Sequence, residues 1–155
     1  MPVPVSSLGR SVRSVSADGV SATVCVVTTA GAAKCWGHNS AGNVGNGSMS
    51  YAVPTPAQVV GLTSDISSIA VGEGTTCAVR RGALLCWGDG DKGSRASGDQ
   101  RDSLTPAPAK VLTSGVKQLA MGSMGGCAVK ARRAYCWGAR AYGQPVSLVP
   151  RLVSF

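Results

Sequence analysis

The six cysteines of this 155-residue sequence stand in three pairs, and the second cysteine of every pair is followed by Trp-Gly. Three kinds of chemistry are open to them. They could form disulfides in an oxidising compartment, stay reduced as small buried hydrophobic residues, or bind a metal. The disulfide is the favoured interpretation, because zinc ligands usually come as two close pairs. The candidates are Cys25 and Cys35, Cys77 and Cys86, and Cys127 and Cys136.

Catalysis by these cysteines is not expected. A cysteine nucleophile needs a base beside it, and His38, the only histidine in the sequence, occurs in one unit alone. No carboxylate pair or phosphate-binding loop recurs at a usable spacing. The acidic stretch at residues 89–99 lacks the glutamate and the ligand spacing of a helix–loop–helix calcium site. The sequence therefore predicts no enzyme, no cofactor and no metal site.

The cysteine pairs mark an internal repeat, since Trp36, Trp87 and Trp137 lie 51 and 50 residues apart. Two apolar residues precede the cysteines of each unit, and a glycine-rich segment and a proline–valine segment follow them. Four short strands in about 50 residues is the size of a propeller blade. We predict an all-β fold, a partial β-propeller of three four-stranded antiparallel blades. The single domain, residues 1–155, then has blades at 12–65, 66–115 and 116–155, with residues 1–11 a strand that completes a neighbouring or terminal blade.

The predicted hairpin register places the two cysteines of each unit opposite one another. A two-residue turn at 81–82 pairs Cys77 with Cys86 at a non-hydrogen-bonded position, where Cα atoms lie about 4.5 Å apart. The third unit keeps this spacing, although its turn at 131–132 lacks the glycine that a type I′ turn favours. The first unit has one more residue, and a three-residue loop ending in Gly31 accommodates it.

The segment CWGHNSAGNVGNGS, which begins at Cys35, resembles the Trp-Gly-x-Asn-x-x-Gly-Gln-Leu-Gly signature of the regulator of chromosome condensation repeat family. The paired cysteines resemble the cysteine-rich bacterial branch of that family. The resemblance implies a β-propeller, and it implies that the signature residues build blades instead of binding a ligand. Family members have roles too diverse to imply one activity here. The signature residues are Trp36, Gly37, Trp87, Gly88, Trp137 and Gly138.

The basic charge of the chain is unevenly placed. Fifteen Lys and Arg against seven Asp and Glu give a net charge of +8, and residues 116–155 contain no acidic residue. Such an excess fits an anionic partner, or a solvated surface whose charges block edge pairing. We expect the hairpin tips to share one face and to form a partner-binding rim of Arg80, Arg81, Lys130, Arg132 and Arg133.

The function that these features favour is a non-catalytic protein–protein interaction module or an assembly subunit. Three blades are too few to close a ring, so the chain is expected to bind another protein, to pair with a second copy, or to be a fragment of a longer closed propeller acting as a binding or inhibitor protein. Contact with chromatin or nucleic acid through the basic rim is a further alternative. No signal peptide or membrane span is visible. Disulfides would favour an extracellular or cell-envelope location.

Overall fold

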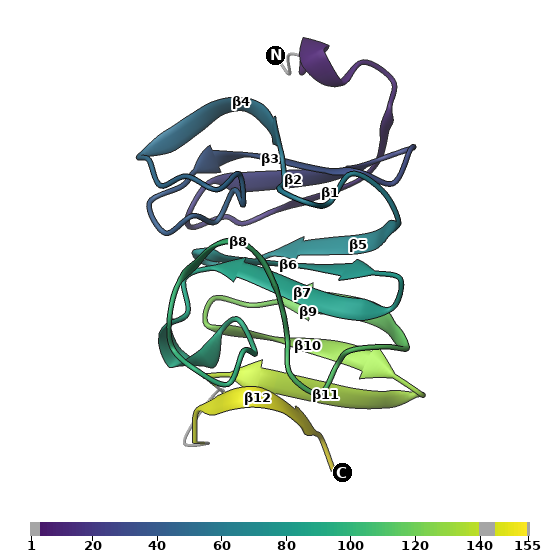
Figure 1. The fold of residues 1–155 in the computed structure, drawn as a ribbon, viewed down its shortest axis with the longest axis vertical. Coiled ribbons are helices and arrows are strands. Elements are labelled where there is room, and N and C mark those ends of the chain that lie inside the picture. The colour runs from purple at the N-terminus through teal and green to yellow at the C-terminus, as the bar shows by residue number, and fades with distance from the viewer. Residues whose placement is uncertain (1–3, 140–144, 155) are drawn as a thin grey trace.

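The computed structural model describes residues 4–139 and 145–154. These residues form three four-stranded antiparallel sheets, stacked in sequence order (Figure 1). Each sheet is one blade, as the repeat predicts. Blade 1 contains β1 (Val12–Ala17), β2 (Thr23–Thr28), β3 (Ala33–His38) and β4 (Ala52–Gln58). Blade 2 contains β5 (Ile66–Val71), β6 (Thr75–Arg80), β7 (Ala83–Gly88) and β8 (Ser103–Pro108). Blade 3 contains β9 (Val116–Met121), β10 (Gly125–Lys130), β11 (Arg133–Gly138) and β12 (Ser147–Leu152).

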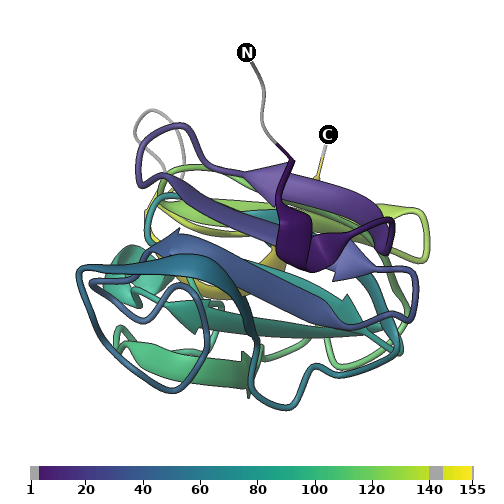
Figure 2. The same cartoon turned by 90° about the horizontal axis from the view of Figure 1, so that it is seen from above.

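The middle blade is covered on both faces, and its central strands are accordingly buried along most of their length. In β6, the residues from Thr75 to Val79 are all buried. A sheet covered on both faces produces such continuous runs instead of an alternation of apolar and polar residues. Two apolar clusters result, one between blades 1 and 2 and one between blades 2 and 3. Figure 2, seen from the blade 1 end, shows the sheets lying one behind another.

The last strand of each blade is an irregular edge strand that contains proline. The pairing of β7 with β8 passes from Cys86–Ala107 to Gly88–Ser103, so β8 has extra residues between the two pairs. Proline lacks the N–H that a central strand would donate, and it is found at edges and bulges. Equivalent irregularities occur in β4 and β12. The proline–valine segments predicted from the repeat are therefore strands, and their irregular edges are poor templates for edge-to-edge pairing.

The strand expected in residues 1–11 falls partly outside the described residues, because residues 1–3 are not among them. Residues 4–11 contain a 3-10 helix, η1 (Ser6–Leu8), followed by a turn at Gly9. Leu8 is 7% exposed and lies four residues before Val12, just as the buried Leu62 lies four residues before Ile66. The segment thus resembles the link that enters blade 2. Its completion of another blade remains a prediction.

The hairpin turns have the predicted lengths and registers. Cys77 lies opposite Cys86, and the turn residues Arg81 and Gly82 have φ values of 50° and 81°. In the third hairpin the turn residues are Ala131 and Arg132, both with positive φ. Side chains other than glycine are disfavoured there by about 1–2 kcal/mol. The third turn therefore forms despite its sequence, held by the strands on either side.

Replacing Arg132, whose φ is 62°, by glycine should stabilise the protein by about 1 kcal/mol, because glycine adopts positive φ without a Cβ penalty. The matched reverse change is Gly82→Ala, whose added Cβ would also lie 2.9 Å from the backbone nitrogen of Gly115. Denaturant unfolding of both variants checks this prediction. A destabilised R132G variant would mean that the arginine side chain contributes more than its backbone strain costs.

Candidate interaction surface

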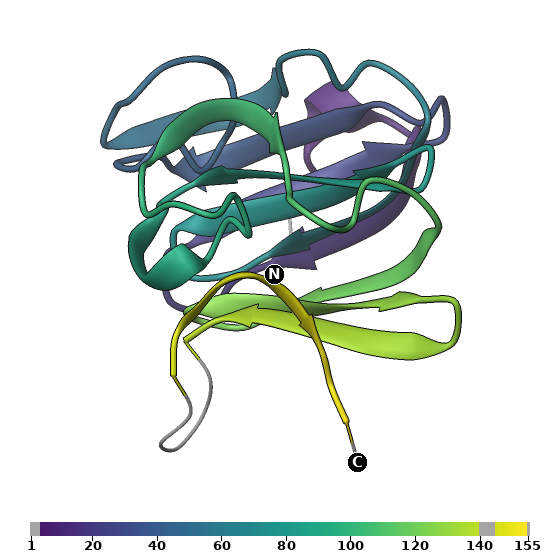
Figure 3. The ribbon, with the colours of Figure 1, turned by 60° about the horizontal axis from the view of Figure 1, so that its bottom comes forward.

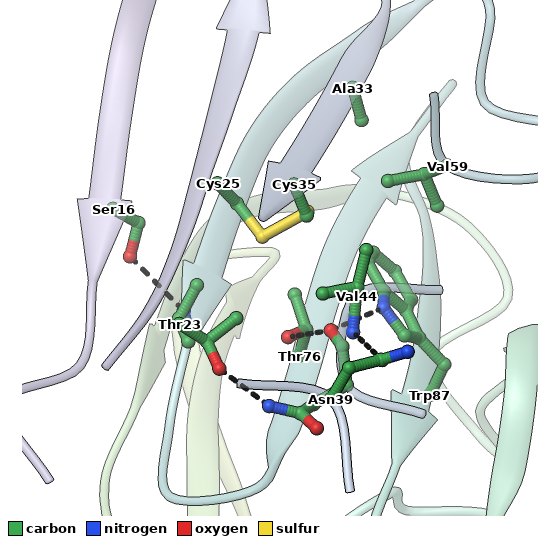
Figure 4. Close-up of a disulfide and its surroundings, with 12 residues drawn as sticks. Ser16, Thr23, Cys25, Ala33, Cys35, Asn39, Val44, Val59, Thr76 and Trp87 are labelled. Carbon is green, nitrogen blue, oxygen red and sulfur yellow. Dashed lines mark hydrogen bonds between the residues drawn. A yellow bond between two sulfur atoms is a disulfide. The ribbon is translucent and has the colours of Figure 1, made fainter. Parts of the chain in front are cut away.

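The tryptophans of the Trp-Gly motif join one blade to the preceding one. The Nε1 of Trp87 donates a hydrogen bond to the carbonyl oxygen of Asn43 in blade 1, at 3.0 Å. The Nε1 of Trp137 donates in the same way to the carbonyl oxygen of Ser94 in blade 2, at 2.8 Å. Both rings are almost fully buried. Figure 4 shows Trp87 lying against Val44, below the disulfide of blade 1. These two tryptophans are structural, as the resemblance implies.

The glycine of each Trp-Gly motif permits a close approach of backbone. A Cβ added to Gly88 would lie 2.2 Å from the carbonyl oxygen of Gly74, and φ at Gly88 is 93°. Gly37 and Gly138 also have positive φ, and a Cβ added to either would likewise lie too close to a backbone carbonyl oxygen. No larger residue fits such a position. Trp36 alone among the three tryptophans is only partly buried, because no blade precedes blade 1 in the described chain.

The six cysteines form the three predicted disulfides. Cys25 pairs with Cys35, Cys77 with Cys86, and Cys127 with Cys136, each with Cα atoms 4.1 Å apart. The first two disulfides are fully buried under the next blade. The third lies on the outer face of blade 3, and Cys127 is exposed. The pairing predicted from the hairpin register is confirmed, and the two alternatives of reduced cysteines and metal ligands do not hold in this structure.

The candidate rim residues lie at one end of the strands, which we call the tip face. This face consists of the hairpin turns at 29–32, 81–82 and 131–132 and of the links between blades at 59–65 and 109–115. In Figure 1 the turns of the second and third hairpins point to the right. Arg81, Arg132 and Arg133 are exposed, whereas Arg80 and Lys130 are half-buried at the strand ends beside the turns. Lys110 lies in the second link and extends the basic surface.

One acidic residue, Asp65, lies in the connections of the tip face within the described chain. Its carboxylate accepts hydrogen bonds from Arg81, the shorter at 2.8 Å. The Ser64 hydroxyl and the Arg81 guanidinium both donate to Asp65 and hold the pKa of its carboxyl below the usual range. This pair joins the first link to the second hairpin. It compensates part of the charge of Arg81, an effect that hairpin positions alone did not reveal.

The opposite end of the strands, which we call the loop face, holds the other acidic residues. Asp18 lies between β1 and β2, and Glu73 between β5 and β6. The connection from β7 to β8 supplies the rest, Asp89, Asp91, Asp99 and Asp102. The same connection contains η2 (Asp91–Gly93). The same connection also contains Lys92, Arg95 and Arg101. The chain is therefore polarised, because the tip face is mainly basic whereas the loop face carries both signs with an acidic excess.

Two buried polar residues of the loop face were not anticipated from the sequence. Asn43 is fully buried and accepts a hydrogen bond from Thr76 through its carbonyl oxygen, at 2.9 Å, besides that from Trp87. Arg95 is 5% exposed and donates to the carbonyl oxygen of Arg101 at 2.7 Å and to Asp99 at 3.2 Å. Both residues pin the glycine-rich segments in place. The side chains at this position bond the same two sites in blades 1 and 2. The Nδ2 of Asn43 donates to the hydroxyl of Thr23 and to the carbonyl oxygen of His38. The hydroxyl of Ser94, at the equivalent position, bonds the hydroxyl of Thr75 and the carbonyl oxygen of Asp89.

The metal-ligating residue types are not clustered among the described residues, which contain no group of three His, Cys, Asp or Glu side chains placed to hold a metal ion. His38 makes an edge-to-face contact with Tyr51, with ring centroids 6.0 Å apart. In residues 4–139 and 145–154 there is also no helix with the length and hydropathy needed to cross a bilayer. The described chain instead presents two charged faces and the two ends of an open stack. The loop face is hollowed beside His38, Glu73 and Asp89, where a cavity of about 670 Å³ lies.

Solved structures match this stack over nearly its whole length. Human WBSCR16 superposes with a TM-score of 0.78 over 92% of the chain, at 20% identity. Yeast RCC1 (Prp20) bound to Kap60 gives 0.77 over 93%, also at 20% identity. The Saccharomyces cerevisiae protein Prp20p, in a study of its binding to Gsp1p and histones, gives 0.78 over 93% at 20% identity. The chain has the fold of an RCC1-type β-propeller.

The chain spans less than two fifths of the length of these RCC1-type propellers, 37% to 38% of each. No protein-family model and no curated protein sequence matches it. The likeness therefore concerns the blades and their stacking, as the repeat signature implies. The charged residues of the tip face have to be interpreted from the chain itself.

Proposed function

We propose that the chain is a non-catalytic interaction module that binds an acidic protein surface through its tip face. The observation that carries the proposal is the separation of charge between the two faces. Exposed Arg81, Arg132 and Arg133 gather at one end, where Asp65 is the single acidic residue of the described connections. Complementary charge steers association and selects partners. Propeller loops are also the usual place for binding residues, because a rigid scaffold positions them.

Two further observations support a protein-binding module, and a third concerns its location. Yeast Prp20p has the same fold and binds Gsp1p and histones, and Kap60 binds it as well. The described turns and links of the tip face contain no aromatic side chain. Because single-stranded nucleic acid is bound largely by stacking on aromatic rings, a protein partner is favoured over nucleic acid. The three disulfides are compatible with an oxidising compartment, and we propose that the module works there.

The experiment compares two double variants of equal charge change. Arg132→Gln with Arg133→Gln neutralises exposed residues of the tip face, and Lys92→Gln with Arg101→Gln neutralises exposed residues of the loop face. Binding to poly-L-glutamate is measured by fluorescence anisotropy at low salt. The tip-face variant should bind about tenfold more weakly or worse, while the loop-face variant should bind like the unmodified chain.

A random DNA duplex of equal charge serves as the second probe. Duplex binding that is stronger than binding to poly-L-glutamate, and that weakens steeply with salt, would replace the acidic protein by nucleic acid as the partner. Equal weakening by the two double variants would contradict a specific role for the tip face. Neutralising Arg80, Arg81 and Lys130 as well should abolish binding.

A further inference from the structure

The two ends of the stack carry the two halves of one repeated interface. At each internal junction, the earlier blade presents its buried disulfide, and the later blade presents its tryptophan and two apolar residues of its first strand. Those apolar residues are Ile66 and Ile69 in blade 2 and Val116 and Leu119 in blade 3. Blade 1 also has a tryptophan-bearing face, and blade 3 also has a disulfide-bearing face. Neither has a partner within the described chain.

The face of blade 1 is built like the faces that are buried inside the stack. Val12 and Val15 stand where Ile66 and Ile69 stand in blade 2, but they are 39% and 66% exposed, against 1% and 9%. Trp36 is half-buried and its Nε1 makes no hydrogen bond within the described residues, whereas Trp87 and Trp137 each donate one to the preceding blade. Blade 1 thus lacks the carbonyl acceptor and the apolar cover that a preceding blade supplies.

The face of blade 3 presents the complementary half. A groove of about 670 Å³ is lined there by Gly126, Cys127, Cys136 and Val153, among others. Val153 is half-buried and stands at the position of Val59 and Ala109, which the next blade covers to 0% and 2% exposure. Figure 3 brings this end of the stack forward, with β12 at its border and no further sheet beyond it.

We infer that the blade 1 face of one copy docks on the blade 3 face of a second copy, and that two copies close a six-bladed ring. The argument is continuity, because this contact would repeat the two internal junctions position by position. It pairs different surfaces of identical chains, and such a heterologous contact forms a closed ring when its rotation closes. Six blades fall within the four to eight of closed propellers. The contact uses the ends of the stack and is independent of the tip face.

Lys34 sets the strength of this contact. It lies on the same side of β3 as Trp36, because side chains alternate along a strand, and it stands where Leu85 and Tyr135 pack in the internal junctions. A lysine there buries its aliphatic stem in the contact and keeps its ammonium group hydrated at the edge of the contact. The contact is therefore reversible, unlike the junctions inside the chain. Lys34→Leu should tighten self-association about tenfold or more.

A complementation experiment tests the inference. Val15→Asp blocks the blade 1 face, and Val153→Asp blocks the blade 3 face, since an unpaired carboxylate is costly in an apolar contact. In sedimentation velocity, the unmodified chain should approach twice 15.6 kDa as its concentration rises. Each blocked variant alone should remain a monomer. A mixture of the two should form a dimer through its one intact contact, and this recovery also shows that both variants are folded. The dimer should be weaker than that of the unmodified chain, because the second contact of the ring would bring the two blocked faces together.

Two results would overturn the inference. One is a monomeric unmodified chain at all concentrations up to the millimolar range. The other is a blocked variant that still self-associates alone, because that requires a contact between identical faces. The tip-face double variant R132Q/R133Q should self-associate normally, so failure of this inference and failure of the proposed function have separate readouts.

Discussion

Replacing Trp87 by alanine is expected to lower the free energy of unfolding by about 3–5 kcal/mol, the range for removing a buried aromatic side chain. Trp87 is 0% exposed and fills the junction between blades 1 and 2. Its loss would also leave the carbonyl oxygen of Asn43 with one hydrogen bond fewer. The junction holds blades 1 and 2 together. In the W87A variant, blade 1 should therefore unfold at a lower denaturant concentration than the other two blades.

The matched control is Trp36→Ala in blade 1. This residue has the same motif and the same strand position, but it is half-buried and donates no hydrogen bond within the described chain. The change should cost well under half of what W87A costs, because little apolar surface is lost from the core. Denaturant unfolding followed by circular dichroism, at a protein concentration too low for self-association, gives both values. Equal losses would mean that tryptophan supports its own blade more than the junction.

The architecture was predictable because the same spacing of cysteines, Trp-Gly and apolar residues occurs in three units. The 50-residue period and the hairpin spacing of Cys77 and Cys86 leave few registers open, and the extra residue of the first hairpin arrives together with Gly31. Local patterns of this kind fix which residues lie opposite one another. In the third hairpin the strand register outweighs the residue preference of the turn. Ala131 and Arg132 adopt positive φ there, and the register is kept.

The candidate surface was only partly predictable. The hairpin tips could be assigned to one face from strand direction alone, but the pairing of Asp65 with Arg81 joins two connections that are 16 residues apart in sequence. The burial of Arg95 depends likewise on Asp99 and on the carbonyl of Arg101. Such contacts depend on how loops fold back on the blades. The unequal exposure of three alike disulfides depends on stacking order, which no single repeat contains.

Mild reduction is expected to open the disulfides in a fixed order, with Cys127–Cys136 first. A reductant has to reach the sulfur atoms, and Cys127 is exposed whereas Cys25, Cys35, Cys77 and Cys86 are all 0% exposed. The buried disulfides can react only after a junction opens. If that local opening costs about 3 kcal/mol, their reduction is slowed by about 100-fold. Alkylation of new thiols, followed by mass spectrometry of the peptides, gives the rate at each site.

Blade 3 provides the control for this order. In the Cys127→Ala, Cys136→Ala double variant the two remaining disulfides should keep their slow rates, because their cover comes from blades 2 and 3 and not from the third disulfide. The second and third disulfides close loops of the same length, with a sequence separation of 9, so chain entropy affects them equally and only burial distinguishes them. Simultaneous loss of all three disulfides would mean that reduction proceeds through global unfolding.

Slower reduction of Cys127–Cys136 at high protein concentration would follow if a second copy covers the blade 3 face, which links the redox measurement to the docking of the two ends.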